Sequence, residues 1–208
     1  MRVLMLSTLL CLASAHAYAH PHVWIDNTAS LILTHGQLTA IQVNWTFDEL
    51  TSSQIIEEFD PNADGTFSAP ELTAMQEALK DSLPETNYYM RFFPPAGTTP
   101  AVKNLEDLHP NTDFHPPTAF TATIQQKDDE KRITYHLTLP LKYPFAVAGQ
   151  TFKLSFLDNS YYTEVTTLEN ELALGTPTCT KTWGEDREHP IYMGMVFPDT
   201  FTITCAGA

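Results

Sequence analysis

The pattern of apolar and polar residues along the chain is mainly that of β-strands. From residue 41 to 47 apolar and polar side chains alternate, as in a strand with one buried face. The preceding segment, 23–33, is also strand-like, and His35-Gly36-Gln37 predicts a hairpin turn between the two. Further strands are expected at residues 88–93, 118–126, 133–141, 151–157, 162–168, 192–197 and 201–205. Many short strands separated by proline-containing loops indicate an antiparallel β-sandwich.

Residues 48–83 interrupt this pattern with helical spacing. Apolar residues recur every three or four positions in 51–59 and again in 71–83, with a polar loop between the two segments. We therefore expect one β-sandwich domain over residues 20–208 that carries an EF-hand-like helix-loop-helix insertion at 48–83.

The loop of this insertion has the composition of a calcium site. Residues 60–71 follow the twelve-residue EF-hand pattern, including Gly65 at the sharp turn in position 6. The expected oxygen ligands are Asp60, Asn62, Asp64, Thr66, Ser68 and Glu71. The alternative is an ordinary connection in which Ser68 and Glu71 only form a helix capping box. A single hand in an exported protein favours a structural role for Ca²⁺.

The first nineteen residues have the features of a signal peptide. Arg2 precedes a short apolar stretch, and Ala17-Tyr18-Ala19 is a typical cleavage site, so the mature chain would begin at His20. Export to the periplasm would place the two remaining cysteines in an oxidising compartment. We therefore expect a Cys179–Cys205 disulfide. A metal-thiolate role for this pair is the weaker alternative, because neither cysteine lies in a C-x-x-C spacing.

Charge restricts the classes of partner. The 208-residue chain has a formal net charge of −14 and contains no basic run. An acidic protein is repelled by nucleic acid and by anionic membrane surfaces, so we expect neither as a partner. No apolar run outside the leader approaches the length of a membrane-spanning helix, so we expect a protein that is not embedded in the membrane.

The new N-terminus is a candidate transition-metal site. The α-amine and imidazole of His20 can form one chelate ring, and His22 and Asp26 lie on the same face of an extended segment. Such nitrogen ligands suit Zn²⁺, with nickel, cobalt and copper as alternatives. His136, on the polar face of a strand, is the expected additional ligand. Other candidate ligands are His109, His115, His189, Asp113, Asp48 and Glu49. The alternative is that these histidines are simply solvated.

Several motifs resemble one family of Gram-negative periplasmic proteins. The segments are H-P-H-V-W-I-D at 20–26, W-T-F-D-E at 45–49, the D-x-N-x-D-G loop, and F-L-D-N-S-Y-Y at 156–162. That family is of undefined function and is described as the periplasmic component of an uncharacterised transport system. Its members are usually encoded beside a nickel/cobalt-type permease, and one is implicated in zinc utilisation. The resemblance implies periplasmic handling of a transition metal through His20 and His22, with such a permease as partner.

These observations favour a binding protein over an enzyme. The chain has no G-x-S-x-G, H-E-x-x-H or phosphate-loop motif. We expect a periplasmic protein that delivers or chaperones a transition metal to a membrane transporter and carries a structural Ca²⁺. Two alternatives stay open at this point. One is a calcium-stabilised adhesion or interaction module, and the other is a copper redox enzyme with an N-terminal histidine brace.

Overall fold

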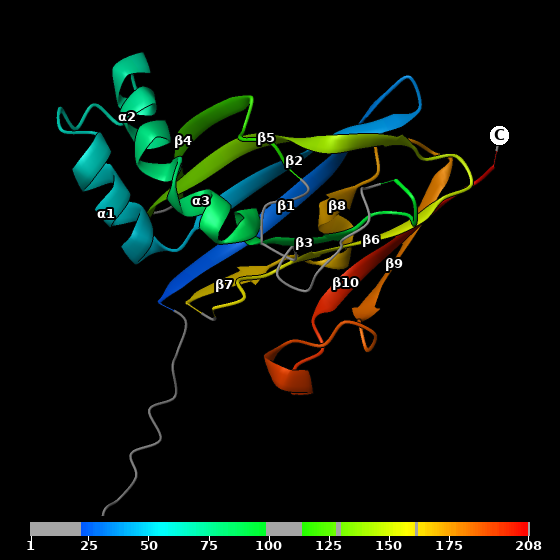
Figure 1. Cartoon of the computed structure of the whole chain (residues 1–208). Coiled ribbons are helices and arrows are strands. Elements are labelled where there is room, and N and C mark those ends of the chain that lie inside the picture. Colours follow the sequence, from blue (N-terminus) through cyan, green and yellow to red (C-terminus); the bar gives the residue numbers. More distant parts are fainter. Residues whose placement is uncertain (1–21, 99–113, 128–129, 161, 208) are drawn as a thin grey trace, which may run out of the picture.

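Two β-sheets and a cover of helices make up the computed structural model, which describes residues 22–98, 114–127, 130–160 and 162–207 (Figure 1). The signal peptide expected at residues 1–19, as well as His20, His109 and Asp113, lies outside the described residues. The strands are β1 Val23–Thr34, β2 Gln37–Phe47, β3 Met90–Phe93, β4 Ala119–Lys127, β5 Glu130–Ala146, β6 Thr151–Phe156, β7 Thr163–Thr166, β8 Leu172–Ala173, β9 Cys179–Glu185 and β10 Asp199–Cys205.

The two sheets form a sandwich-like arrangement. The first has the order β4-β5-β2-β1-β7, with β8 also pairing with β1, and the second has the order β3-β6-β10-β9. Most neighbours are antiparallel, as expected, but β7 and β8 run parallel to β1. The expectation of a fully antiparallel sandwich is therefore wrong at this edge. The chain changes sheets between β6 and β7, and that crossover lets β7 enter the first sheet in the same direction as β1.

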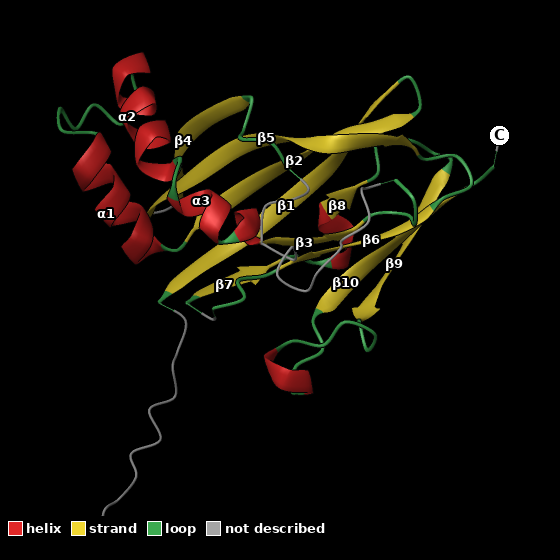
Figure 2. Ribbon diagram, in the orientation of Figure 1, coloured by secondary structure: helices red, strands yellow, loops and turns green. Residues whose placement is uncertain are grey.

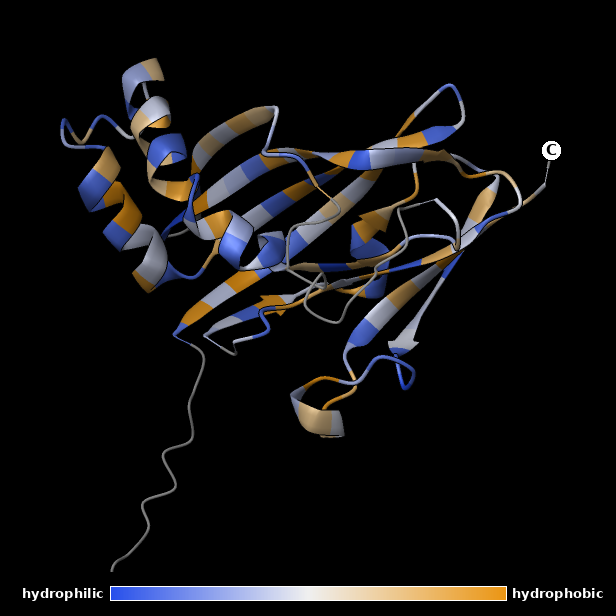
Figure 3. Cartoon of the chain, in the orientation of Figure 1, coloured by the Kyte–Doolittle hydropathy of each residue, from blue (hydrophilic) through white to orange (hydrophobic). Residues whose placement is uncertain are grey.

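The first hairpin confirms the predicted alternation. His35 and Gly36 both have positive φ, 51° and 78°, as a tight two-residue turn between twisted strands requires. Val43 and Trp45 on β2 are fully buried, whereas Asn44 between them is on the opposite, partly exposed face. Figure 3 shows the resulting bands of hydrophobic and hydrophilic residues along these strands. One face of the first sheet therefore contributes to the core and the other is polar.

Helices cover one end of the first sheet, beside β4 and β5 (Figure 2). They are α1 Glu49–Phe59, α2 Ala69–Leu79 and the short α3 Ser82–Glu85. A buried serine, Ser52, connects α1 to the sheet: its hydroxyl donates to the carbonyl of Phe47 and accepts from the N–H of Ile133. The helix expected over 71–83 is interrupted after Leu79, so that α3 forms a separate turn.

Two segments differ from the expected strands. Residues 192–197 form a 3-10 turn, η4 Tyr192–Gly194, inside a tight reversal closed by an Ile191–Val196 bridge. Tyr192 and Met193 have positive φ, which a strand excludes. Residues Asn87–Tyr89 likewise form a short 3-10 turn, η1, so that β3 begins only at Met90. A third short 3-10 turn, η3, spans Glu169–Glu171.

The predicted disulfide is confirmed. Cys179 and Cys205 are directly opposite each other on β9 and β10, and their sulfurs are bonded. The pair joins the open ends of β9 and β10 at the edge of the second sheet. None of the helices in the described residues is long and apolar enough to span a membrane.

Candidate functional site

Three segments that are distant in sequence meet where β1 begins. The backbone N–H of His22 donates to the carbonyl of Tyr162 at 2.8 Å, and β1 then pairs with β7 from Val23 and Thr163 onward. On the other side, β1 pairs with the end of β2. This end of the sheet, which we call the β1 entry, therefore joins residues 22–26 to segments 45–48 and 156–163.

Asp48 fixes one side of the β1 entry. Its carboxylate accepts hydrogen bonds from the N–H of Trp24 at 3.0 Å and from the N–H and hydroxyl of Thr51 at 2.9 and 2.7 Å, while its own N–H donates to the carbonyl of Trp24. Burial alone would raise the pKa of Asp48, but these hydrogen bonds outweigh it and lower the pKa. The carboxylate is thus an N-cap for α1 that also orients the start of β1.

Asp158 fixes the other side of the β1 entry. Its buried carboxylate accepts from the N–H and hydroxyl of Ser160 and from the N–H of Thr163, at 2.7–2.9 Å. These bonds shape the turn that presents the carbonyl of Tyr162 to His22. Asp158 and Asp48 are therefore positioning residues, and their oxygens are already engaged by backbone and hydroxyl donors.

The side chain that this arrangement leaves available is His22. It is exposed, and its ring lies 5.0 Å from the ring of Tyr162, which is itself 57% exposed. Among the described residues, none is hydrogen-bonded to the His22 imidazole. Exposed Trp24 follows on the same face of β1, as the alternation predicted. A ligand nitrogen next to the expected N-terminus is consequently accessible from solvent.

Family membership bears on this site. A family described as "Protein of unknown function (DUF1007)" matches residues 5–193, nearly the whole chain. The chain belongs to the DUF1007 family. An uncharacterised protein of Haemophilus influenzae is 25% identical over 148 residues, which cover 71% of this chain and 63% of that relative. The chain thus accounts for less than two thirds of the relative's length, and no activity comes with either match.

The DUF1007 chain does not bring the other expected metal ligands to His22. Asp26 is four residues further along β1, about 13 Å at strand spacing, and pairs with Arg132 at 3.0 Å. His136 lies on β5, two strand spacings or about 10 Å from β1. Both of its ring nitrogens are hydrogen-bonded, to Asn44 at 2.8 Å and Thr123 at 3.1 Å. Ligation by Asp26 or His136 remains a prediction and would require these contacts to break.

The loop between α1 and α2 has part of the hydrogen-bonded geometry expected of a cation site. The buried Asp60 carboxylate accepts from the N–H groups of Asp64 and Gly65 at 3.2 and 3.0 Å, and Gly65 has the positive φ of 80° that the turn requires. The carboxylate of Asp64 accepts from the N–H and hydroxyl of Thr66 and from the amide of Asn62. These bonds lower the pKa of Asp64. The loop backbone therefore already curves around its oxygen atoms.

Glu71 has a different partner in this DUF1007 chain. One of its oxygens accepts from both the N–H and the hydroxyl of Ser68 at 2.7 Å, which is the capping-box contact at the start of α2. Within the described residues, Asp60, Asp64 and Glu71 do not form a group with ligand atoms within 4.8 Å of one another. Bidentate ligation by Glu71 would require it to turn away from Ser68.

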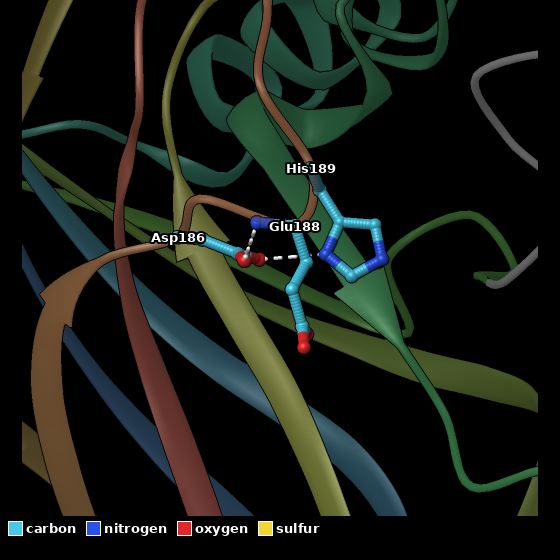
Figure 4. A group of neighbouring side chains, drawn as sticks. All are labelled: Asp186, Glu188 and His189. Atoms are coloured by element: carbon cyan, nitrogen blue, oxygen red, sulfur yellow. Dashed lines mark hydrogen bonds and ion pairs between the residues drawn. The ribbon is translucent and has the colours of Figure 1, made fainter.

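One cluster with metal-ligand chemistry was missed by the sequence reasoning. Asp186, Glu188 and His189 place their ligand atoms within 4.8 Å of one another in the segment after β9 (Figure 4). His189 lies 2.7 Å from buried Asp186 and stacks on Phe93 at 4.1 Å. The charged run E-D-R-E-H at 185–189 was the available sequence signal.

A lysine already occupies this cluster. The Lys153 ammonium on β6 lies 3.2 Å from Asp186 and 2.5 Å from Glu188. Burial alone would raise the pKa of Asp186, but hydrogen bonds from His189, Glu188 and Lys153 outweigh it and lower the pKa. The contact with Glu188 raises the pKa of Lys153. Lys153 already neutralises Asp186 and Glu188, so the cluster forms an ion-pair network that joins the segment after β9 to β6 of the second sheet.

Proposed function

We propose that this DUF1007 protein acts outside the cytoplasm as a binding protein for a divalent transition metal. In this proposal the α-amine and imidazole of His20 and the imidazole of His22 bind the ion, with Zn²⁺ as the leading candidate. The protein then delivers the ion to a membrane transporter, for which the resemblance suggests a permease of the nickel/cobalt type. The observation that carries the proposal is the β1 entry, where the backbone N–H of His22 is hydrogen-bonded to Tyr162 while its imidazole stays exposed.

The geometry favours reversible binding and transfer of the metal ion over its permanent burial in the protein. An ion held at an exposed chain terminus keeps open coordination positions, which a receiving protein can fill. The hydrogen bonds of Asp48 and Asp158 fix the start of the strand from which His22 projects, so the His22 end of a ligand set has a defined position. Pre-ordering of the backbone also lowers the entropy lost when a partner docks.

We further propose that the 60–71 loop holds a structural Ca²⁺. The donor set fits a hard cation, because Asp60, Asn62, Asp64, Thr66, Ser68 and Glu71 all offer oxygen. The curved backbone around Asp60 supports this, and rotation of Glu71 away from Ser68 would complete the ligand set. Bound Ca²⁺ would clamp the facing ends of α1 and α2. Melting temperature should then rise with added Ca²⁺, and should cease to do so in Asp60→Ala/Glu71→Ala.

The transition-metal proposal is tested by Zn²⁺ affinity of exported protein whose N-terminus has been identified by mass spectrometry. Competition with a chromophoric chelator at pH 7 should show that His22→Ala weakens binding more than tenfold. An added residue ahead of His20 should have the same effect, since it removes the amine chelate and leaves both imidazoles. Binding should also weaken below about pH 6, because imidazole and amine bind metal only when neutral.

Two matched histidine variants locate the site. His189→Ala removes an imidazole elsewhere on the surface and should leave Zn²⁺ affinity unchanged, whereas His136→Ala should lower the affinity only if His136 is the additional ligand. If His189→Ala lowers the affinity and His22→Ala does not, the ion binds at the Asp186 cluster and the N-terminal proposal is wrong. If Ca²⁺ alone binds, the protein is better explained as a calcium-stabilised interaction module.

A further inference from the structure

A cleft of about 380 Å³ lies between the β7 edge of the first sheet and the second sheet, and we call it the β7 cleft. On one side it touches six consecutive residues, 163–168. On the other side Phe201 of β10 and Trp183 of β9, which are opposite each other in register, form an aromatic floor. Trp183 and Leu168 are 39% and 53% exposed, so the cleft opens to solvent.

Contact with consecutive residues indicates that the β7 cleft follows the backbone edge of β7. Successive side chains of a strand point to opposite faces, so a cavity over one face would touch alternate residues only. β7 pairs with β1 on one side and, within the described residues, has no strand on the other (Figure 1). The N–H of Thr163 points away from β1, because it donates to Asp158 at 2.9 Å. Val165, two residues further along the strand, therefore presents its N–H and carbonyl on the same open side.

The charge of the β7 cleft is negative. Among the described residues that line it, three are acidic and none is basic. Asp158 is already engaged by Ser160 and Thr163. Glu164 and Asp199 are exposed, and within the described part of the chain neither carboxylate has a hydrogen-bond or ion-pair partner. Positive charge is therefore favoured in an occupant, and a second copy of this chain, with its net charge of −14, is disfavoured.

The two faces of a strand added to β7 would meet different surfaces. Such a strand continues the alternation of the sheet, so that its residues beside Val165 face the second sheet and those beside Glu164 face outward. Val165 is buried and lines the cleft together with Phe201 and Trp183, which favours apolar side chains on that face. Glu164 is exposed on the other face, which favours lysine or arginine there.

We propose that the β7 cleft binds an extended segment of a partner protein in which basic and apolar residues alternate, and that this segment adds to β7 as a further strand. Backbone hydrogen bonds to the open edge hold the segment, and its alternate side chains give specificity. The four residues of β7 offer a pairing length of about 13 Å. The inference goes beyond metal binding, because none of the described lining residues is a proposed ligand of either ion.

The test uses the full exported chain and two hexapeptides of equal composition, both acetylated and amidated at their ends. In the first, lysine and valine alternate, and in the second three lysines precede three valines. Titration calorimetry should show that the alternating peptide binds roughly 3- to 10-fold more tightly, because only this peptide matches both faces of the edge. At saturation with it, hydrogen exchange at the Val165 amide should slow, since that N–H gains an acceptor.

Variants locate the peptide on the protein. Glu164→Lys should weaken binding of the alternating peptide roughly 3- to 10-fold, because an attraction becomes a repulsion. Glu57→Lys is the matched control: Glu57 is exposed on α1 and does not line the cleft, so the same change of net charge should have a much smaller effect. Trp183→Thr, which suits an edge strand, should also weaken binding because it removes part of the aromatic floor.

Four results would overturn the proposal. Equal affinity for the two peptides, or binding of neither, would show that the protein recognises no alternating strand. Unslowed exchange at Val165 with the peptide bound would show that the peptide does not pair with β7. Equal effects of Glu164→Lys and Glu57→Lys would place the peptide elsewhere. A dimeric free protein whose Val165 amide is already protected would show that a second copy occupies this edge.

Discussion

Replacement of Asp48 by alanine should lower the free energy of unfolding by more than is usual for a residue near the surface. The substitution removes the N-cap of α1, a contribution of about 1 kcal/mol. It also removes the carboxylate that accepts from Trp24 and from the hydroxyl of Thr51. Hydrogen bonds to charged groups contribute about 1.5–3 kcal/mol when buried. These are only partly buried, so we expect a total loss of about 2–3 kcal/mol.

Urea unfolding followed by circular dichroism measures this loss directly. A decrease of that size corresponds to a fall in Tm of about 5–10 °C for a domain of this length. Glu57→Ala is the matched control, because Glu57 is an exposed acid on the same helix and should change stability by less than about 0.5 kcal/mol. An Asp48→Ala loss no larger than that of the control would refute the proposed role of this carboxylate.

The pH dependence provides a separate check on Asp48. Its pKa is lowered in the folded protein, so the folded state favours the charged form more than the unfolded state does. This stabilisation is present above the unfolded pKa of about 3.9 and is lost as the pH falls through the lower folded pKa. The stability difference between the parent and Asp48→Ala should therefore be constant from pH 5 to 7 and shrink below about pH 4.

Three further substitutions test other parts of the fold. Cys179→Ala/Cys205→Ala should lower the unfolding free energy by about 3 kcal/mol in urea, since the disulfide closes a 26-residue separation. Ser52→Ala should lower the unfolding free energy by about 1–3 kcal/mol, because it leaves the buried N–H of Ile133 without its acceptor. If the lost acceptor is the cause, hydrogen exchange at the Ile133 amide should accelerate. Gly175→Ala should reduce Tm, because a Cβ at this position, with φ of 70°, would meet a β1 carbonyl at 2.5 Å; an unchanged Tm would contradict it.

The parts of the fold that follow local rules could be predicted from the sequence. Alternation gave the β1–β2 hairpin, because one face of each strand enters the core. Helical spacing located α1 and α2, although the second helix ends earlier than expected. Strand β9 escaped notice because it is an edge strand in which Cys179 is the buried residue and the others show no apolar alternation.

The candidate site depends on contacts between distant residues, and these could be predicted only in part. The motifs at His22 and Tyr162 were found as separate segments, but their contact arises from the parallel pairing of β7 with β1, which no local pattern encodes. The Asp186–His189 contact lies within the local run 185–189 and could have been predicted, whereas its ion pair with Lys153 of β6 joins distant residues. His136 was correctly placed on the polar face of its strand, but one of its ring nitrogens is already hydrogen-bonded to Asn44.

The pairing of β1 with β7 also orders the events of folding. Residues 22–26 are synthesised first, whereas Thr163–Thr166 follow about 140 residues later, and the Asn27 side chain bonds to Thr167 across the same separation. A contact with so large a sequence separation forms late, because the intervening chain must first be arranged. An unfinished or truncated chain would consequently leave the segment around His22 unanchored. In this way the fold makes the backbone position of His22 depend on residues 158–167, so that only a chain that includes this segment can fix the start of β1.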